Sequence, residues 1–134
     1  MKVIIAGSRT IVAFSILVDV IKEFDKIDKN ITITEVVCGG AKGVDKLGSL
    51  WGSRHNIPIR LFPADWERYG RKAGMVRNEE MADYAEAAII LWDGKSSGTA
   101  NMIDFAKQYN LTTLVYRTDL LSYSLYNRTG TDDT

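Results

Sequence analysis

Cysteine is almost absent from this chain of 134 residues, which contains Cys38 and no other. A single cysteine cannot form a disulfide within the chain, and it offers no cysteine cluster that would hold a metal ion. We therefore expect no bound metal and no disulfide framework. Because disulfides are typical of oxidising compartments, this composition favours a location in the reducing cytoplasm.

An excess of either charge is also lacking, because 17 Lys and Arg residues balance 17 Asp and Glu residues. A net charge of zero gives no general attraction to nucleic acids or to anionic membranes, so neither is expected as a partner. No apolar run approaches the roughly 20 residues that a membrane-spanning helix needs. The opening MKVIIAGSR becomes polar after Ala6, which is too early for the apolar core of a signal peptide.

What the chain does contain is a regular alternation of short apolar runs and amphipathic segments. The β-branched apolar runs predict strands at residues 2–6, 33–38, 57–62, 88–92 and 112–116. Apolar residues spaced three and four apart predict helices at 11–29, 44–55, 75–87 and 100–109. Residues 63–74 are expected to form a long loop between the third strand and the third helix.

The alternation of strands and helices predicts an α/β protein. Strands joined by helices pair in parallel, and near-uniform apolar strands indicate that both faces of the sheet are covered. We therefore expect a three-layer, Rossmann-like, doubly wound parallel sheet of about five strands. One domain would span residues 1–116, and residues 117–134 would form a C-terminal extension that is partly disordered.

The loops that follow the first four strands carry most of the glycine, hydroxyl and cationic residues of interest. In doubly wound sheets, ligands bind beyond the carboxyl ends of the strands, so these loops are expected to meet at one edge. Glycines let backbone N–H groups approach an anion, and helix N-termini carry partial positive charge. The candidate ligand-binding residues are Gly7, Ser8, Arg9, Gly39, Gly40, Ala41, Gly43, Asp45, Asp65, Trp66, Arg77, Asn78, Asp93, Ser96, Ser97, Gly98 and Thr99.

Each loop taken alone also has a purely structural interpretation. The dinucleotide fingerprint GxGxxG is absent after the first strand, and GGAKG lacks the spacing of a P-loop. Glycines also make tight turns, and Asp45, Asp65 and Ser96 are of the residue types that cap helices. Trp66 would either stack on a ligand's base or pack its loop onto the sheet. The interpretation as a binding site depends on all four loops lying at the same edge.

Three stretches carry a specific resemblance: MKVIIAGSR, VVCGGAKGVDKLGSLW and PADWERYGRKAGMVRNEEMADYAEAAIILWDGKSSGTANMI. They resemble the YspA-like (cpYpsA-related) branch of the SLOG superfamily, whose Rossmann-like members are similar to DprA and LOG ("lonely guy") proteins. The resemblance implies a domain that binds nucleotides or nucleotide-derived molecules. It also implies a role in conflict systems, including those that involve phages, because several SLOG branches look like sensors or processors there.

The LOG resemblance is incomplete where LOG enzymes carry out their chemistry. Arg77 and Met81 match the first LOG motif, but Asn78 stands where LOG proteins have lysine. In the second motif Gly98 and Thr99 match, and the register places Met102 at the catalytic glutamate. Methionine has no titratable group and cannot transfer protons. The catalytic residues of an enzyme therefore stay unknown, with Arg77 and Asp93 as candidates.

The leading hypothesis is a protein that binds an ADP-ribose-like or cyclic nucleotide signal, as a sensor or by sequestering it in phage–host conflict. Its phosphates would lie over the glycines of residues 39–43 and over the helix start at 97–99, with Arg9 and Arg77 neutralising charge. Asp45 or Asp93 would hold ribose hydroxyls. The alternatives are a nucleotide N-glycosidase or phosphoribohydrolase similar to LOG enzymes, and a DprA-like protein that binds single-stranded DNA. No cofactor is expected, and relatives suggest a homodimer.

Overall fold

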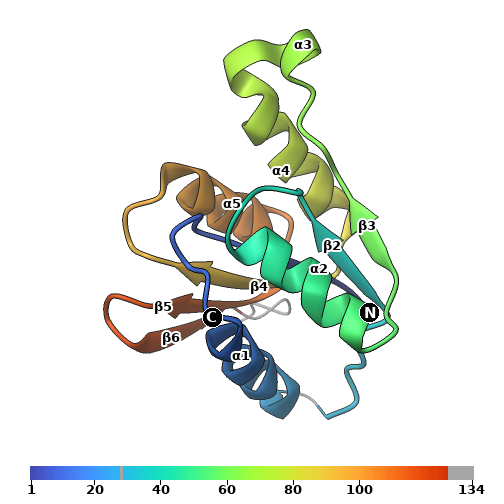
Figure 1. Ribbon diagram of the computed structural model, residues 1–134, viewed down its shortest axis with the longest axis vertical. Coiled ribbons are helices and arrows are strands. Elements are labelled where there is room, and N and C mark those ends of the chain that lie inside the picture. Colours follow the sequence, from blue (N-terminus) through green and yellow to red (C-terminus); the bar gives the residue numbers. More distant parts are fainter. Residues whose placement is uncertain (28, 127–134) are drawn as a thin grey trace.

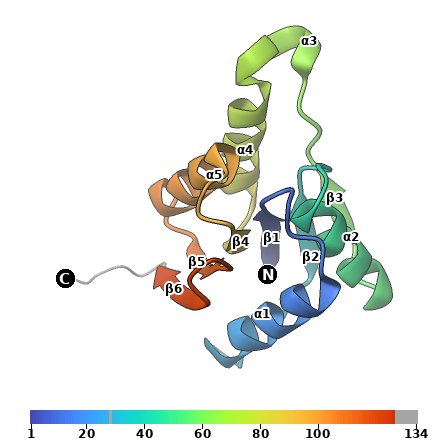
Figure 2. The ribbon, with the colours of Figure 1, turned by 60° about the vertical axis from the view of Figure 1, so that its left-hand side comes forward.

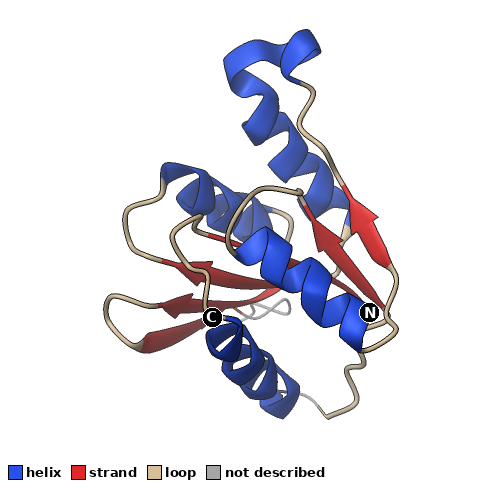
Figure 3. Cartoon of the chain, viewed as in Figure 1, coloured by secondary structure: helices blue, strands red, loops and turns tan. Residues whose placement is uncertain are grey.

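A computed structural model describes residues 1–27 and 29–126 of the chain (Figure 1). In this part of the chain, helices cover both faces of one six-stranded sheet (Figure 3). The strands are β1 Lys2–Gly7, β2 Glu35–Cys38, β3 Ile59–Leu61, β4 Ala87–Trp92, β5 Thr112–Arg117 and β6 Ser122–Tyr126. The helices are α1 Phe14–Ile27, α2 Val44–Arg54, α3 Trp66–Tyr69, the 3-10 turn η1 Gly70–Lys72, α4 Ala73–Tyr84 and α5 Ser97–Gln108.

The order of strands across the sheet confirms the predicted fold class. The order is β3-β2-β1-β4-β5-β6, and every pair except β5–β6 is parallel. Val3 of β1 pairs with Val36 of β2 on one side and with Ala87 of β4 on the other. The chain therefore builds outward from β1 in one direction and from β4 in the other. The reversal between β1 and β4 is the point where sheets of this kind leave a crevice.

Two apolar cores lie on opposite faces of the sheet. Alternate residues of a strand point to opposite faces, so Val3 and Ile5 join one core while Ile4 and Ala6 join the other. The first core is closed by α1 and α2, and the second by α4 and α5 (Figure 2). The β1 and β4 residues in these cores have almost no exposed surface. This double burial holds β1 and β4 rigidly, and the loops that leave them are therefore well positioned.

The sheet continues beyond residue 116, where the sequence pattern placed the end of the domain. Residues Ser122–Tyr126 form β6, which pairs antiparallel with β5 at the edge of the sheet. Four of its five residues are exposed, so the segment lacks the apolar signature of a buried strand. The remainder of the predicted extension, residues 127–134, lies outside the described residues.

The loop predicted at residues 63–74 contains two short helical turns, α3 and η1, which together we call the arm. Asp65 caps α3, because its Oδ1 accepts a hydrogen bond from the N–H of Arg68 at 3.1 Å. The next helix, α4, begins at Ala73 and is therefore two residues longer at this end than predicted. The arm and the first turns of α4 project beyond the sheet (Figures 1 and 2).

Candidate functional site

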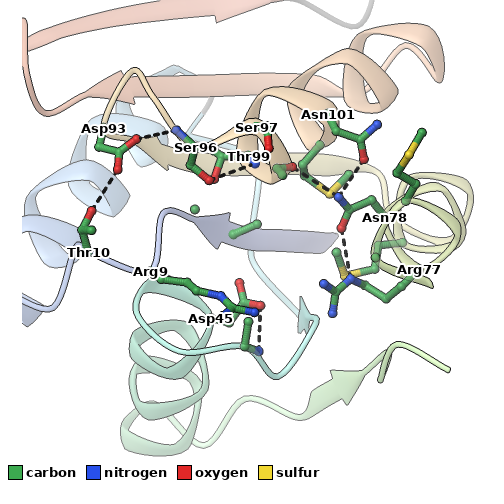
Figure 4. Close-up of a pocket in the computed structure, with 18 of the residues that line it drawn as sticks. Arg9, Thr10, Asp45, Arg77, Asn78, Asp93, Ser96, Ser97, Thr99 and Asn101 are labelled. Atoms are coloured by element: carbon green, nitrogen blue, oxygen red, sulfur yellow. Dashed lines mark hydrogen bonds between the residues drawn. The ribbon is translucent and has the colours of Figure 1, made fainter. Parts of the chain in front are cut away.

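A pocket of about 730 Å³ opens at the carboxyl edge of the sheet, at the reversal between β1 and β4 (Figure 4). Its walls come from the loops after β1, β2 and β4, from the arm, and from α4 and α5. Twelve of the predicted ligand-binding residues line it. They are Gly7, Arg9, Ala41, Asp45, Trp66, Arg77, Asn78, Asp93, Ser96, Ser97, Gly98 and Thr99.

Asp93 organises the loop between β4 and α5. Its Oδ1 accepts hydrogen bonds from the backbone N–H groups of Lys95 and Ser96, both at 2.9 Å. Its Oδ2 accepts a third from the hydroxyl of Thr10 at 3.0 Å (Figure 4). These bonds, led by those from Ser96 and Lys95, lower the pKa of Asp93 to about 2. The carboxylate is thus a turn former and a poor proton acceptor near neutral pH.

Ser8 joins the loops after β1 and β4 but does not line the pocket. Its hydroxyl accepts a hydrogen bond from the N–H of Asp93 at 3.0 Å and lies 3.5 Å from the hydroxyl of Thr99. Its own N–H donates to the carbonyl of Leu91. The side chain is 1% exposed. From its buried position outside the pocket, Ser8 therefore fixes the spacing of the two loops.

The first turn of α5 presents unpaired donors to the pocket. Ser96 caps the helix, accepting hydrogen bonds from the N–H of Thr99 at 3.4 Å and from its hydroxyl at 3.0 Å. Among the described residues, the N–H groups of Ser97 and Gly98 donate to no protein atom. A Cβ added at Gly98 would meet open space. Free N–H groups at the positive end of a 12-residue helix favour an anion.

Arg77 connects α4 to the ends of β2 and β3 across the pocket. Its Nη1 donates to the carbonyl of Gly39 at 2.7 Å and to that of Phe62 at 3.5 Å, and its Nε donates to the Oδ1 of Asn78 at 3.1 Å. Within residues 1–27 and 29–126, no carboxylate forms a salt bridge with it. Its charge is therefore available to an anionic ligand.

Asn78, at the position of the LOG lysine, is a buried structural link. Its side chain is 8% exposed. Its Nδ2 donates to the carbonyl of Gly98 at 3.3 Å and to the Oδ1 of Asn101 at 2.9 Å (Figure 4). Together with the bond from Arg77, these contacts use both ends of the amide. Asn78 therefore ties α4 to the start of α5 and orients both neighbours.

Asp45 is a buried carboxyl group in the wall of the pocket. It lies in the first turn of α2, is 6% exposed, and accepts a hydrogen bond from the N–H of Ala41 at 3.0 Å. Burial raises its pKa to about 6, against the opposing effects of the Ala41 N–H and of Arg77 and Arg9. Near neutral pH this group can either accept or release a proton.

Of the glycines after β2, Gly39 and Gly43 lie close to other parts of the chain, and the role of these glycines in ligand binding stays a prediction. Gly39, Gly40 and Gly43 do not line the pocket, whereas Ala41 does. A Cβ at Gly43 would lie 2.6 Å from the Cα of Arg9 and from the carbonyl oxygen of Ser8. Gly43 thus lets the loops after β1 and β2 touch, which brings Arg9 to the pocket. Asp65 lies outside the pocket too, since it caps α3 and lines a second pocket of about 450 Å³.

Several residues that line the pocket were not predicted from the sequence. On α4, the pocket-facing residues follow helical spacing from Gly74 through Asn78 to Met81, a pattern that was visible in the sequence. Met102, at the position of the LOG glutamate, is 1% exposed and lines the pocket. The side chain at this position therefore lines the pocket but cannot act as an acid or a base. The remaining additions are Ala6, Thr10, Arg71, Met75 and Asn101.

The titration of Asp45 gives a first test. A carboxyl group whose pKa is higher in the folded state binds its proton more tightly when folded. Protonation of Asp45 thus stabilises the fold below its unfolded pKa of 3.8, and this stabilisation is lost as the pH rises through about 6. Asp45→Asn should raise the free energy of unfolding by on the order of 3 kcal/mol at pH 8 and change it little at pH 4.

Urea unfolding of both proteins at pH 4, 6 and 8 measures this effect. The difference between the two proteins isolates Asp45, because the lowered pKa of Asp93 contributes to both alike. A difference that stays constant with pH would show that Asp45 does not titrate in this range.

Neither a metal site nor a membrane-spanning helix is found in the described ranges. No group of three or more His, Cys, Asp or Glu side chains is placed to hold a metal ion. None of the helices in these ranges has the length and apolar character needed to cross a membrane.

The reversed strand order and the pocket at the reversal define a Rossmann-like α/β protein with a crevice at the carboxyl edge of its sheet. Residues 1–69 match the model of the YspA, cpYpsA-related SLOG family, and the chain belongs to that family. It is also similar to the Gene 61 protein of Mycobacterium phage D29, with 35% identity over 85 residues. That match covers 59% of this chain and 68% of the phage protein. No solved structure shows a significant match.

Proposed function

We propose that this protein binds a small nucleotide or a nucleotide-derived signal, such as an ADP-ribose-like or cyclic species, in the pocket at the reversal of the sheet. The observation that carries the proposal is the convergence of Arg9, Arg77 and the free N–H groups of the first turn of α5 on one pocket. Neither arginine forms a salt bridge within the described part of the chain. Membership of the SLOG family supports a nucleotide-related ligand.

The remaining polar groups suit the sugar of such a ligand. Asp45 lies between the two arginines and offers carboxyl oxygens to hydroxyl groups (Figure 4). Ser97 and Thr10 are exposed hydroxyl residues in the same wall. A pocket of about 730 Å³ falls within the usual range for small-molecule sites and has room for more than a phosphate. The similarity to a mycobacteriophage protein supports sequestering of a signal in phage–host conflict as the biological setting.

A second candidate function is hydrolysis of an N-glycosidic bond. The observation that supports it is the titratable carboxyl group of Asp45 in the pocket wall. The LOG glutamate is replaced by Met102, and the low pKa of Asp93 makes it a poor base. Asp45 is the pocket carboxyl whose pKa, about 6, is suited to proton transfer near neutral pH. If the protein is an enzyme, Asp45 would therefore exchange the proton and Arg77 would hold the anion.

One experiment separates binding from turnover. Native mass spectrometry of the freshly purified protein should show a bound nucleotide, and calorimetry should show binding of AMP or ADP-ribose. A ligand at a hundredfold excess over its Kd stabilises the fold by about 2.7 kcal/mol, so the Tm should rise by several degrees. Chromatography of the same mixtures should show no free adenine.

The possible outcomes are distinct. Free adenine that disappears in Asp45→Asn would favour the enzyme. Absence of binding to AMP, ADP-ribose, cyclic AMP and NAD would contradict the proposal. A gel shift with single-stranded DNA that weakens steeply with salt would instead support the DprA-like alternative.

A homodimer also remains a prediction. Of the apolar residues of α5, Met102 and Ile103 are buried against the sheet within the chain, and Phe105 is partly buried against the same core.

A further inference from the structure

The arm contributes little to the core of the protein. Neither α3 nor η1 contains a buried residue. Ala73, where α4 begins, is the first residue after the arm to be buried, at 1% exposure. The side chains of the arm are therefore free to serve something other than the stability of the sheet.

Two side chains of the arm line the pocket. Trp66 is 59% exposed and Arg71 is also exposed, yet both are part of the pocket wall. Met75, on the first turn of α4, is 53% exposed and lines the same wall. A large aromatic side chain that is exposed at the rim of a pocket is placed to pack against a ligand there.

The pocket is consequently divided into two chemically different halves. The half formed by the arm and by the facing surfaces of α4 and α5 contains the large apolar side chains of the pocket, Trp66, Met75, Met81 and Met102, together with the polar residues Arg71, Arg77, Asn78 and Asn101. The other half, formed by the loops after β1 and β4 and the start of α5, contains hydroxyl groups, carboxylates and free N–H groups (Figure 4). A flat aromatic ring suits the first half, and a sugar phosphate suits the second.

We infer that the arm is the base-recognition element of the site: Trp66 stacks on a nucleobase and Arg71 flanks it, while the phosphate lies at the start of α5. This inference rests on the proposed function and adds the orientation of the ligand and the need for an aromatic base. A ribose phosphate without a base would occupy only the polar half. The arm would therefore determine which nucleotide-derived molecules are selected.

The arm also supplies matched controls. Tyr69 and Arg68 belong to the same short helix as Trp66, and both are exposed. They line the second pocket, with Asp65, and not the pocket at the reversal. Trp66 can thus be compared with Tyr69, and Arg71 with Arg68, within the arm.

The test uses AMP and ribose 5-phosphate, which share the sugar phosphate and differ in the base. Calorimetry of the wild type should show AMP binding about tenfold more tightly than ribose 5-phosphate. Trp66→Ala should weaken AMP binding about tenfold and leave ribose 5-phosphate binding unchanged. Tyr69→Ala and Arg68→Ala should bind AMP within twofold of the wild type, and Arg71→Ala should lose several-fold for AMP alone.

Tryptophan fluorescence provides a second readout. AMP should quench the emission of the wild type, because Trp66 is exposed, whereas Trp51 is 8% exposed and Trp92 is partly buried. Trp66→Phe should keep most of the AMP affinity and lose most of the quenching. Equal loss of both ligands in Trp66→Ala, or equal effects of Trp66→Ala and Tyr69→Ala, would overturn the role of the arm while leaving the proposed function intact. If neither AMP nor ribose 5-phosphate binds the wild type, the proposed function fails and this inference fails with it.

Discussion

Arg77→Ala is expected to weaken the binding of AMP or ADP-ribose by about a hundredfold. Charge-assisted hydrogen bonds contribute roughly 1.5–3 kcal/mol each, and every 1.4 kcal/mol is a factor of ten in Kd. Arg77 is half-buried in the pocket wall and forms no salt bridge within residues 1–27 and 29–126, although the Asp45 carboxylate interacts with it electrostatically. Calorimetric titration of wild type and variant measures the loss.

The same substitution should also lower the stability of the fold. The carbonyls of Gly39 and Phe62 would lose their donor, and Asp45 would lose a cation that opposes its raised pKa. The cost is expected to be about 1–3 kcal/mol, which is detectable as a lower Tm. Binding is therefore compared at a temperature where both proteins are folded.

Two further variants separate charge from geometry. Arg77→Lys keeps the charge but cannot reproduce the bonds to Asn78 and Gly39 together, so we expect a loss of about tenfold. Arg54→Ala removes a cation from the last turn of α2, outside the pocket, and should leave binding unchanged. If Arg77→Ala lowered the Tm but bound AMP as the wild type does, Arg77 would be a structural clamp only.

The layout of the sheet could be predicted because its buried strands have a strong local signature. Strands such as β1 and β4 are buried on both faces, and their continuous apolar runs are difficult to mistake for anything else. The edge strand β6 has no such signature, because four of its five residues are exposed and it is held in place by pairing with β5. Tertiary pairing, which no local pattern encodes, determines whether such a segment becomes a strand.

The residues of the candidate site likewise fall into those that the sequence predicts and those that it does not. Residues that directly follow a strand, such as Arg9 and Asp93, were predicted because topology alone brings strand ends together. The bond from Thr10 to Asp93 links residues 83 positions apart, and nothing local in either segment indicates it. Arg71 contributes because the arm, which projects beyond the sheet, forms part of the pocket wall. Its position follows from the direction in which α3 and α4 project, which the sequence pattern does not encode.

The departures from the LOG motifs have a consistent physical meaning. Where LOG proteins have lysine, Asn78 is buried and its amide is used by Arg77, Gly98 and Asn101. Where they have glutamate, Met102 contributes an apolar surface. Both changes remove charge from the depth of the pocket. At these two positions the pocket therefore lacks the charged groups of LOG proteins, while Asp45, elsewhere in its wall, still carries a titratable carboxyl group.

Gly43→Ala is expected to destabilise the fold by about 3–5 kcal/mol. Gly43 has φ 77° and ψ −128°, a backbone conformation that residues with a Cβ rarely adopt, and forcing it costs on the order of 1–3 kcal/mol. The added Cβ would also lie 2.6 Å from the Cα of Arg9, so the loops after β1 and β2 would have to separate. Overpacking of this kind typically costs a further 1–3 kcal/mol. Denaturant unfolding measures the total.

Gly40→Ala is the matched control, because Gly40 has the same φ of 77° in the same loop, but its added Cβ would meet no atom within 4 Å. This variant carries only the backbone strain, about 1–2 kcal/mol, and the difference between the two variants isolates the contact with the β1 loop. Gly43→Ala should in addition weaken AMP binding, since the loop it displaces carries Arg9, whereas Gly40→Ala should not. Equal unfolding free energies for the two variants would show that the contact between the loops does not hold the pocket together.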